Sequence, residues 1–430
     1  ALASVEERRT SASALIRGHR KVSAYFCLKI STFLLSNLLL FALCQISSNA
    51  FARLKSIDEA GRSELWKVHY VIERDGNYTL KSESAVKIIA QKAINDNSVK
   101  EIYYSPATTT IDHKSIEAYT ITPDKKKLSV DRSLVEDKPV ASSVSGFDNT
   151  NKIMIAYPGV EVKSMLHLNY EEKIYNSPTH NFSFVYYLGS QGILEKGSEI
   201  VFHSKKPLKI ELIDPRGIAK NSLKSRKITN NKRYPYTYKL RVTKDIFAEV
   251  AGEDYCQLAG EHLPRLVVST LKSLKDIVTK ETQEKYKKRL SEPLPMKYQD
   301  IVAKAKTLTT YSEKINYITE SVINSMTYIG NWKTVDGSFI PRSKQDIANT
   351  SYGDCKDFSL VTASILKEVG IKSSIAWIRR GVLPDPDHHL KIDTTNHAIV
   401  YIDQIDDLHK QMWLDPTNSF VYTKSICIQQ

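Results

Sequence analysis

The chain has 430 residues, which is long for one domain, so two or three domains are expected. Its hydrophobic fraction of 41% is ordinary for a globular protein and excludes a largely disordered chain. The formal charge is +13, but lysine and arginine are scattered rather than clustered with aromatic residues. We therefore expect no nucleic-acid partner and a basic, solvated surface. A weak attraction to anionic membranes or cell-wall polymers is the alternative.

Residues 1–52 have the pattern of an export signal. Basic residues between Arg17 and Lys29 precede the largely apolar run Ile30–Ile46, and Ala50–Ala52 forms an A-x-A cleavage site. Cleavage there predicts a mature periplasmic chain that starts at Arg53. In the competing interpretation residues 30–46 stay uncleaved and anchor the chain in the inner membrane, facing the periplasm. Because the first residue is not Met, residues 1–20 are expected to be a fragment end or an over-extended reading frame.

Export changes the interpretation of the cysteines. After cleavage Cys256, Cys355 and Cys427 remain. In an oxidising compartment this odd number suggests one disulfide and one free thiol. A bridge between Cys256 and Cys427 would leave Cys355 free, but spacing does not establish it. Zinc-ligand spacing and calcium-loop motifs are both missing from the sequence, so we expect no metal and no cofactor.

Residues 53–250 have the pattern of a β domain. Short runs rich in β-branched and aromatic residues alternate with turn signals such as Asp75–Asn77 and Asp214–Gly217. Period-2 alternation in several runs indicates sheets with one buried face, hence a β-sandwich. The predicted strands are Trp66–Ile72, Lys100–Tyr104, Ser115–Ile121, Met165–Tyr170, Phe182–Tyr187, Glu199–His203 and Tyr236–Val242.

This portion is similar to a domain of uncharacterised function that precedes transglutaminase-like cores in many exported bacterial proteins. The matching residues are Tyr103–Pro106, the turn at Asp124, Ala156–Gly159, and a strand with Glu171 and Glu172. The tandem order of the two parts carries more of the resemblance than any one residue.

Residues 251–300 are expected to form a helical linker to a core at 301–430. Leu263–Val278 carries apolar residues on one helical stripe, and Lys280–Pro293 is expected to be a charged, exposed connection. A second helix is predicted at Tyr298–Leu308. A third begins at Thr310, where Glu313 completes a capping box. Its buried face is expected to contain Ile315, Ile318, Val322 and Met326.

The stretch Ser351–Leu360 predicts the start of a partly buried helix. Asp354 occupies the N-cap position, and Asp357 adds a carboxylate in the first turn. Cys355 therefore lies where unpaired backbone N–H groups and the positive helix end favour a thiolate. Such a thiol is a good nucleophile when a base lies near it. The apolar positions that continue the helix to Gly370 are Phe358, Val361, Ile365 and Val369.

Two later segments supply candidates for the base and for its orienting acid. Asn396–Ile402 is predicted to be a strand with His397 near its start, and Met412–Thr417 a second strand with Asp415 at its tip. An imidazole can deprotonate a thiol, and a carboxylate can hold the tautomer of the imidazole. The alternative is that none of the three residues is catalytic: a structural cysteine, a core histidine and an aspartate that ends a strand.

At these residues the sequence resembles the transglutaminase-like core of papain-type thiol enzymes. The resemblance rests on Gly353–Asp357, Asn396–Ala398 and Trp413–Thr417, and it covers residues 300–420. It implies that Cys355 is the nucleophile, His397 the base and Asp415 the orienting acid. It also suggests Trp332 as an oxyanion donor, although a packing role is the alternative. The expected fold class is α+β: an N-terminal β-sandwich, then a core whose Cys-bearing helix packs on an antiparallel sheet.

The expected chemistry is acyl transfer on protein or peptide amides by an exported thiol enzyme. Nothing in the residues decides whether the acceptor is water, as in a protease or amidase, or an amine, as in a transglutaminase. The second hypothesis is a catalytically inactive binding or assembly module in the periplasm. It rests on the short distance from Asp415 to the end of the chain, because relatives usually continue with further strands, so a core truncated at the C-terminus is expected. A membrane-tethered sensor would require residues 30–46 to stay uncleaved.

Overall fold

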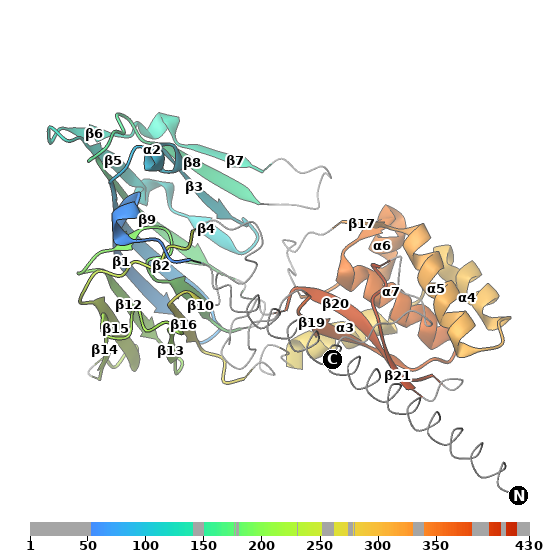
Figure 1. Ribbon diagram of the computed structural model, residues 1–430. Coiled ribbons are helices and arrows are strands. Elements are labelled where there is room, and N and C mark those ends of the chain that lie inside the picture. The colour runs from blue at the N-terminus through green and yellow to red at the C-terminus, as the bar shows by residue number, and fades with distance from the viewer. Residues whose placement is uncertain are drawn as a thin grey trace, which may run out of the picture. The chain divides into compact units, whose positions relative to one another are not determined.

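The computed structural model has a mixed α+β fold, which confirms the predicted fold class (Figure 1). It describes residues 53–140, 150–175, 177, 180–229, 231–251, 262–273, 278, 280–329, 339–380, 395–405 and 410–418. The predicted export signal, Trp332, Cys256 and Cys427 lie outside these residues. In the described part of the chain, no helix is both long enough and apolar enough to cross a bilayer.

A ten-stranded sheet dominates the described residues of the N-terminal half. Its strands follow the order β14-β15-β12-β1-β2-β9-β5-β6, while β11 pairs with β1 and β4 with β9. Strand β1 is parallel to β11 and β12 and antiparallel to β2. The strands are β1 (Arg62–Ile72), β2 (Tyr78–Ile88), β4 (Thr109–Ile111), β5 (Glu117–Ile121), β6 (Lys127–Ser129), β9 (Met165–Ile174), β11 (Ile193–Leu194), β12 (Glu199–Ser204), β14 (Leu223–Ile228) and β15 (Tyr236–Val242).

Two three-stranded sheets cover one face of this large sheet. One has the order β10-β16-β13 and the other β3-β8-β7. Val68 and Tyr70 on β1 share a hydrophobic core with Val268 on β16, and Leu168 on β9 shares another with Ile153 on β8. The strands are β3 (Val99–Tyr104), β7 (Glu136–Pro139), β8 (Asn151–Ala156), β10 (Ser183–Tyr187), β13 (Lys209–Ile213) and β16 (Arg265–Ser269); helix α2 (Lys92–Asn97) precedes β3.

The alternation in β1 explains this layered arrangement. Val68 and Tyr70 are buried, whereas Lys67 and His69, which alternate with them, are exposed. One face of the strand is therefore apolar and must be covered, which is the physical reason for a sandwich. All the predicted strands fall on observed strands, apart from a residue or two at their ends. Strand β2, with its polar sequence around Ser82 and Ser84, was not predicted.

Part of the predicted helical linker is wrong. The stretch Leu263–Val278, expected to be a helix, contains β16, the central strand of the small sheet β10-β16-β13. All five residues Arg265–Ser269 are buried. A short, continuous apolar run has no period of its own, so helix and strand cannot be told apart from it without the pairing partners. Strand pairing therefore extends the β region beyond residue 250.

The next segment also differs from the expectation. Lys280–Pro293 is not an exposed connection, because helix α3 (Lys280–Ser291) occupies most of it. Leu290 packs against the core of the C-terminal half. The helix α4 (Gln299–Lys306) and the capping box at the start of α5 (Tyr311–Ser325) agree with the predictions. Short 3₁₀ helices lie at Ile57–Glu59, His113–Ser115, Arg132–Leu134 and Met296–Tyr298.

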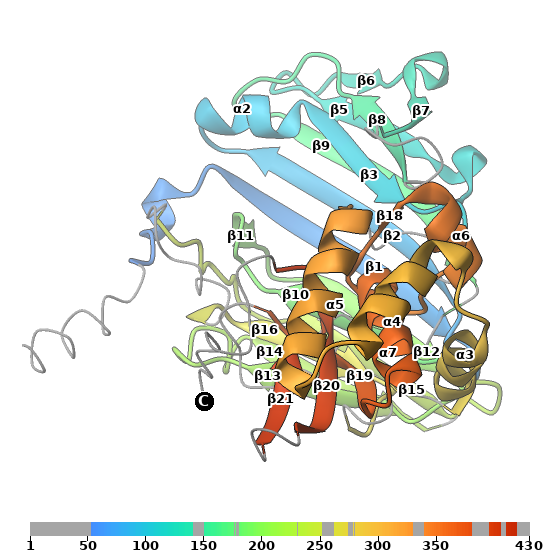
Figure 2. The same cartoon turned by 90° about the vertical axis from the view of Figure 1, so that its right-hand side faces the viewer.

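Helix α7 (Cys355–Glu368) is the centre of the C-terminal half (Figure 2). It packs against α5 and against a sheet of order β19-β20-β21. Every residue from Cys355 to Leu366 is buried, so the helix is covered on all sides. The remaining elements are α6 (Lys344–Thr350), β17 (Thr327–Tyr328), β18 (Tyr352–Gly353), β19 (Ser373–Ile378), β20 (His397–Ile405) and β21 (Lys410–Leu414). As predicted, a Cys-bearing helix thus packs on an antiparallel sheet that carries His397.

Candidate active site

The N-terminus of α7 begins as the sequence predicts. The side chain of Asp354 accepts hydrogen bonds from the backbone N–H groups of Lys356 and Asp357, at 2.9 and 3.3 Å. Gly353 precedes this cap because a Cβ atom there would lie 2.6 Å from the Cβ of Asp357. The cap and this close approach place Cys355 at the first helical position.

Buried ion pairs hold this helix start. The Arg342 Nε donates to Asp357 Oδ2 at 2.8 Å, and its backbone N–H donates to Oδ1 at 2.9 Å. The same guanidinium also reaches the carbonyl of Tyr352. Burial and the neighbouring Asp354 raise the pKa of Asp357, and Arg342 opposes that shift. Lys356, only 2% exposed, forms an ion pair with Asp354. These contacts give Lys356, Asp357 and Tyr352 a structural role at the start of the helix.

His397 and Asp415 meet at adjacent strand ends. Strand β20 begins at His397, and β21 pairs with it up to Val400 and Leu414, one residue before Asp415. The distance from His397 Nε2 to Asp415 Oδ2 is 2.8 Å. Asn396 supports the start of β20, because its side chain accepts from the backbone N–H of Arg380 at 2.6 Å and donates to the Arg380 carbonyl at 3.0 Å.

The charge state of Asp415 determines which imidazole nitrogen carries the proton. Burial by itself would raise the pKa of Asp415, but hydrogen bonds from His397 and Thr417 outweigh it and hold that pKa below its usual range. Thr417 contributes its backbone N–H at 3.0 Å and its hydroxyl at 2.7 Å. The carboxylate is therefore an acceptor, so His397 Nε2 is the donor and Nδ1 is left as the basic nitrogen.

The thiol of Cys355 lies beside the start of β20. It is fully buried, and the backbone N–H groups of Ala398 and Lys356 contact it. One turn along α7, the Ser359 hydroxyl donates to the Ala398 carbonyl at 3.1 Å and joins the helix to the strand. The structure thus brings Cys355 next to the residue that follows His397, while His397 contacts Asp415.

The expectation that the helix terminus favours a thiolate is wrong for the resting structure. Burial is the main cause that raises the pKa of Cys355 to about 12, and the Asp354 carboxylate adds to it. Lys356 and the two backbone N–H groups act in the opposite direction but are outweighed. At neutral pH the thiol is therefore protonated, and a base must remove its proton during the reaction.

Two tyrosines near the thiol were not predicted as part of the site. Tyr286 on α3 donates from its hydroxyl to the Phe339 carbonyl at 2.8 Å and accepts from Trp377 Nε1 at 2.8 Å. Tyr328 is 44% exposed, and its pKa is raised to about 12 by burial and then by Cys355, Asp354 and Asp415. Neither has a recognisable motif; only the pairing of Tyr328, the last residue of β17, with Gly353 on β18 places it there.

Comparison with known proteins finds a similar domain family for the β region and supports the fold. Residues 74–244 match the family described as "Domain of Unknown Function with solved-structure structure (DUF3857)", which is less than half of the chain. No curated protein matches the sequence. The region before the core is therefore similar to a domain family that has no assigned function.

Solved structures show the wider similarity. A putative protease from Parabacteroides distasonis has a TM-score of 0.64 and 17% identity, over 82% of this chain and 67% of that chain. The periplasmic domain of TgpA from Pseudomonas aeruginosa has a TM-score of 0.22 and 9% identity, over 72% of this chain and 93% of that chain. The first likeness shows a common fold, and the second is too weak to carry an argument.

Proposed function

We propose that this protein is a thiol-dependent acyl-transfer enzyme of the transglutaminase-like type, acting on amides of proteins or peptides. One observation carries the proposal: the 2.8 Å hydrogen bond between His397 and Asp415, at the strand end where the buried Cys355 thiol contacts Ala398. A structural histidine or aspartate would not require a thiol at this position, and a structural cysteine would not require an oriented imidazole.

The reaction starts with a neutral thiol. Nδ1 of His397 takes the proton while Cys355 Sγ attacks the amide carbonyl carbon, and Asp415 stabilises the imidazolium through Nε2. The tetrahedral intermediate then breaks its C–N bond, and the imidazolium gives its proton to the leaving amine. A thioester remains on Cys355. Attack by water releases an acid, and attack by an amine releases a new amide. In both cases the C–S bond breaks, and His397 takes the proton of the attacking group and returns it to the Cys355 thiolate.

The developing oxyanion needs a hydrogen-bond donor. The Asp354 cap engages the N–H groups of Lys356 and Asp357 but not that of Cys355, so the Cys355 N–H is the donor we assign. Trp332 is proposed as a second donor, as the family resemblance implies, and it lies outside the described residues. Protein or peptide is the proposed substrate, and the periplasm the proposed location, because residues 1–52 have an export pattern. N-terminal sequencing of the purified mature chain tests the location, with Arg53 as the expected first residue.

An activated ester tests the chemistry without knowledge of the substrate. With p-nitrophenyl acetate we expect an acetyl adduct on Cys355, mapped by peptide mass spectrometry. His397→Ala is expected to slow its formation by about 100-fold or more, the usual contribution of a general base. His69→Ala, at an exposed position of β1, is the matched control and is expected to change nothing. Adding a primary amine separates the two acceptors, because a new amide product indicates a transglutaminase.

The second candidate function is a non-catalytic binding module with the same fold. The observation that favours it is the thiol itself, which is fully buried and has a raised pKa. In that case Cys355 would be acetylated no faster than Cys256 or Cys427, and His397→Ala would leave its rate unchanged. This result would contradict the enzyme proposal.

A further inference from the structure

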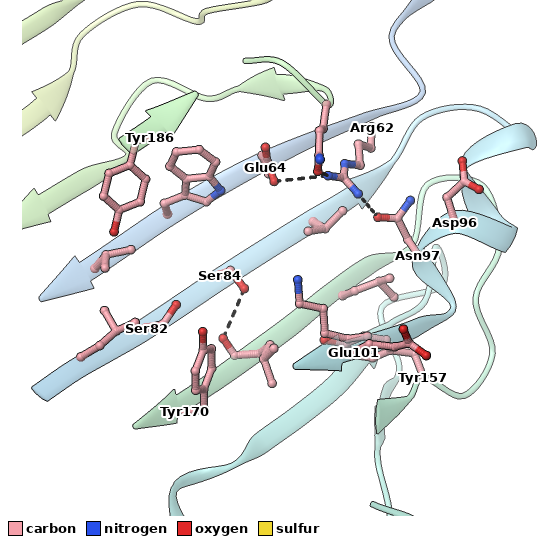
Figure 3. A pocket seen from close by; sticks show the side chains of 18 of the residues that line it. Arg62, Glu64, Ser82, Ser84, Asp96, Asn97, Glu101, Tyr157, Tyr170 and Tyr186 are labelled. Atoms are coloured by element: carbon pink, nitrogen blue, oxygen red, sulfur yellow. Dashed lines mark hydrogen bonds and ion pairs between the residues drawn. The ribbon is translucent and has the colours of Figure 1, made fainter. Parts of the chain in front are cut away.

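A second candidate site lies in the β region, far from Cys355 in the sequence (Figure 3). It is a cavity of about 650 Å³ on the face of the large sheet that the two small sheets cover. Its lining includes residues of the core under β10 and β16, such as Tyr70, and of the core under β3 and β8, such as Leu168. The cavity therefore lies where the two small sheets leave the large sheet uncovered. We call it the β2 cleft.

Strand register defines the floor of the β2 cleft. Trp66 on β1 pairs with Ser84 on β2, which pairs with Leu168 on β9. In the next row Val68 pairs with Ser82, which pairs with Tyr170. From Glu64 to Tyr70 the floor runs along about 20 Å of strand. This length suits an elongated ligand rather than a single compact one.

The two serines create the hollow. On the same face of β2, Leu80 and Ile88 are buried, whereas Ser82 and Ser84 between them are only partly buried. A protein layer over this face would favour large apolar side chains at both positions. Small hydroxyl side chains in the middle of a sandwich face instead leave space. The Ser84 hydroxyl donates to the Leu168 carbonyl at 3.4 Å, so its oxygen is left as an acceptor for a ligand in that space.

Aromatic side chains form the walls at one end. Tyr186 on β10 contacts Trp66 and Phe184, with ring centroids 6.0 and 4.6 Å apart, and its hydroxyl contacts that of Tyr70. Figure 3 shows Tyr186 at one end of the cleft and Arg62, Asn97 and Glu101 at the other. Rings in such a wall can stack on apolar or aromatic groups of a ligand.

The other end of the β2 cleft is lined by charged side chains of both signs. Arg62 contacts Asn97, donates to Gln191 at 2.8 Å and lies 3.8 Å from Glu64. In the described part of the chain, the buried Arg62 Nε has no hydrogen-bond acceptor. Two cations, Arg62 and Lys100, thus lie beside the one carboxylate of Glu64 at this end of the cleft.

Of the two cations, Lys100 is the one without an ion-pair partner among the described residues. Its side chain is exposed to the cleft, and no described residue forms a hydrogen bond or ion pair with its ammonium group. The surrounding protein desolvates it and lowers its pKa; Arg62 adds to that shift and Glu64 opposes it. The other two carboxylates of the rim do not offset it, because Glu101 pairs with Lys152 at 2.7 Å and Asp96 lies exposed on α2.

We propose that the β2 cleft binds a short peptide that has a free carboxylate next to an apolar or aromatic side chain. The carboxylate takes the place of the missing partner of Lys100 and Arg62, the side chains lie against Tyr186 and Trp66, and the peptide groups bond to Ser82, Ser84 and Tyr170. A fatty acid would satisfy the cations but leave the serine hydroxyls facing hydrocarbon, so a peptide fits better. This binding site is independent of the chemistry at Cys355.

The test compares N-acetyl-alanyl-alanyl-phenylalanine with its C-terminal amide by isothermal titration. The protein is the full chain carrying Cys355→Ala, so that no peptide is consumed. We expect saturable 1:1 binding of the acid, and binding at least about 10-fold weaker for the amide, since one charge-assisted hydrogen bond is lost. Laurate is the comparison ligand and is expected to bind more weakly than the peptide acid.

Matched variants assign the binding to the cleft. Lys100→Gln is expected to lower the affinity for the peptide acid about 10-fold and to leave the affinity for the amide unchanged. Lys87→Gln, on the outward face of β2, is expected to change neither affinity. Ser84→Phe fills the cleft and should abolish binding of both the acid and the amide. If thermal unfolding shows that this variant is unstable, Ser82→Leu is the milder replacement. Equal binding of acid and amide, tighter binding of laurate, or full binding by the filled variants would each overturn the proposal.

Discussion

At the start of helix α7 the described ionic side chains have counter-ions: Arg342 contacts Asp357, and Lys356 contacts Asp354. In the β2 cleft, Lys100 has no ion-pair partner among the described residues. The charges at the α7 start are largely buried and have counter-ions within the chain, whereas the exposed Lys100 side chain lines the cleft without one. A site that must hold its own geometry completes its polar network, whereas a site that recruits a ligand leaves one partner missing.

The largest effect is expected from breaking the complete network. Arg342→Ala leaves Asp357, whose side chain is 3% exposed, without its guanidinium partner, although the backbone N–H of residue 342 still donates to it. We expect the free energy of unfolding to fall by about 3 kcal/mol, as when one member of a buried pair is removed. Urea denaturation measures it. Lys126→Ala breaks the exposed pair with Asp124 and serves as the control, with no measurable change expected. A loss as small as that of the control would show that the network does not hold α7.

A smaller, pH-dependent effect is expected at Asp415. Its pKa is lowered in the folded protein, so the carboxylate contributes stability that is present above its ordinary pKa and is lost as the pH falls through the folded value. Asp415→Asn removes this contribution. Urea denaturation at pH 6 and pH 3 should therefore show a gap between wild type and variant that shrinks at pH 3. Asp58→Asn, at an exposed position, is the control. A gap that widens on acidification would contradict the assigned charge state.

The smallest effect has the opposite sign and belongs to the cleft. Ser84→Val replaces a poor strand former with a β-branched apolar residue on a partly uncovered face. We expect the free energy of unfolding to rise by about 0.5 kcal/mol, because positions kept for binding are rarely optimal for stability. Thermal unfolding compares it with Ser84→Ala, which removes the hydroxyl without filling space. If Ser84→Val is less stable than Ser84→Ala, Ser84 is required for packing and is not kept for a ligand.

Local signals in the sequence account for the elements that were predicted well. The cap at Asp354 and the capping box of Thr310 and Glu313 involve residues only three positions apart, so their hydrogen bonds can be inferred without the fold. The strand at His397 has an apolar run of its own. The ordering of Cys355, His397 and Asp415 along the chain was likewise visible, although not the distances between them.

Other features depend on partners distant in the sequence. Strand β16 is a strand because β10 and β13 flank it, and nothing within Arg265–Ser269 excludes a helix. Strand β2 was missed because Ser82 and Ser84 weaken its β pattern, yet β1 and β9 pair along almost all of it. The high pKa of Cys355 also follows from burial by distant elements, which outweighs the local helix terminus.

By itself the sequence predicted the fold class and the start of α7, which the structure confirms, and it supplied the three residues of the candidate site, since each depends on patterns of residue type along the chain. Only the tertiary structure decided that His397 and Asp415 are 2.8 Å apart, that the thiol is protonated at rest, and that Lys100 faces a cleft without a counter-ion. Distances, desolvation and missing partners are properties of segments that meet in space, and residue spacing along the chain does not encode them directly.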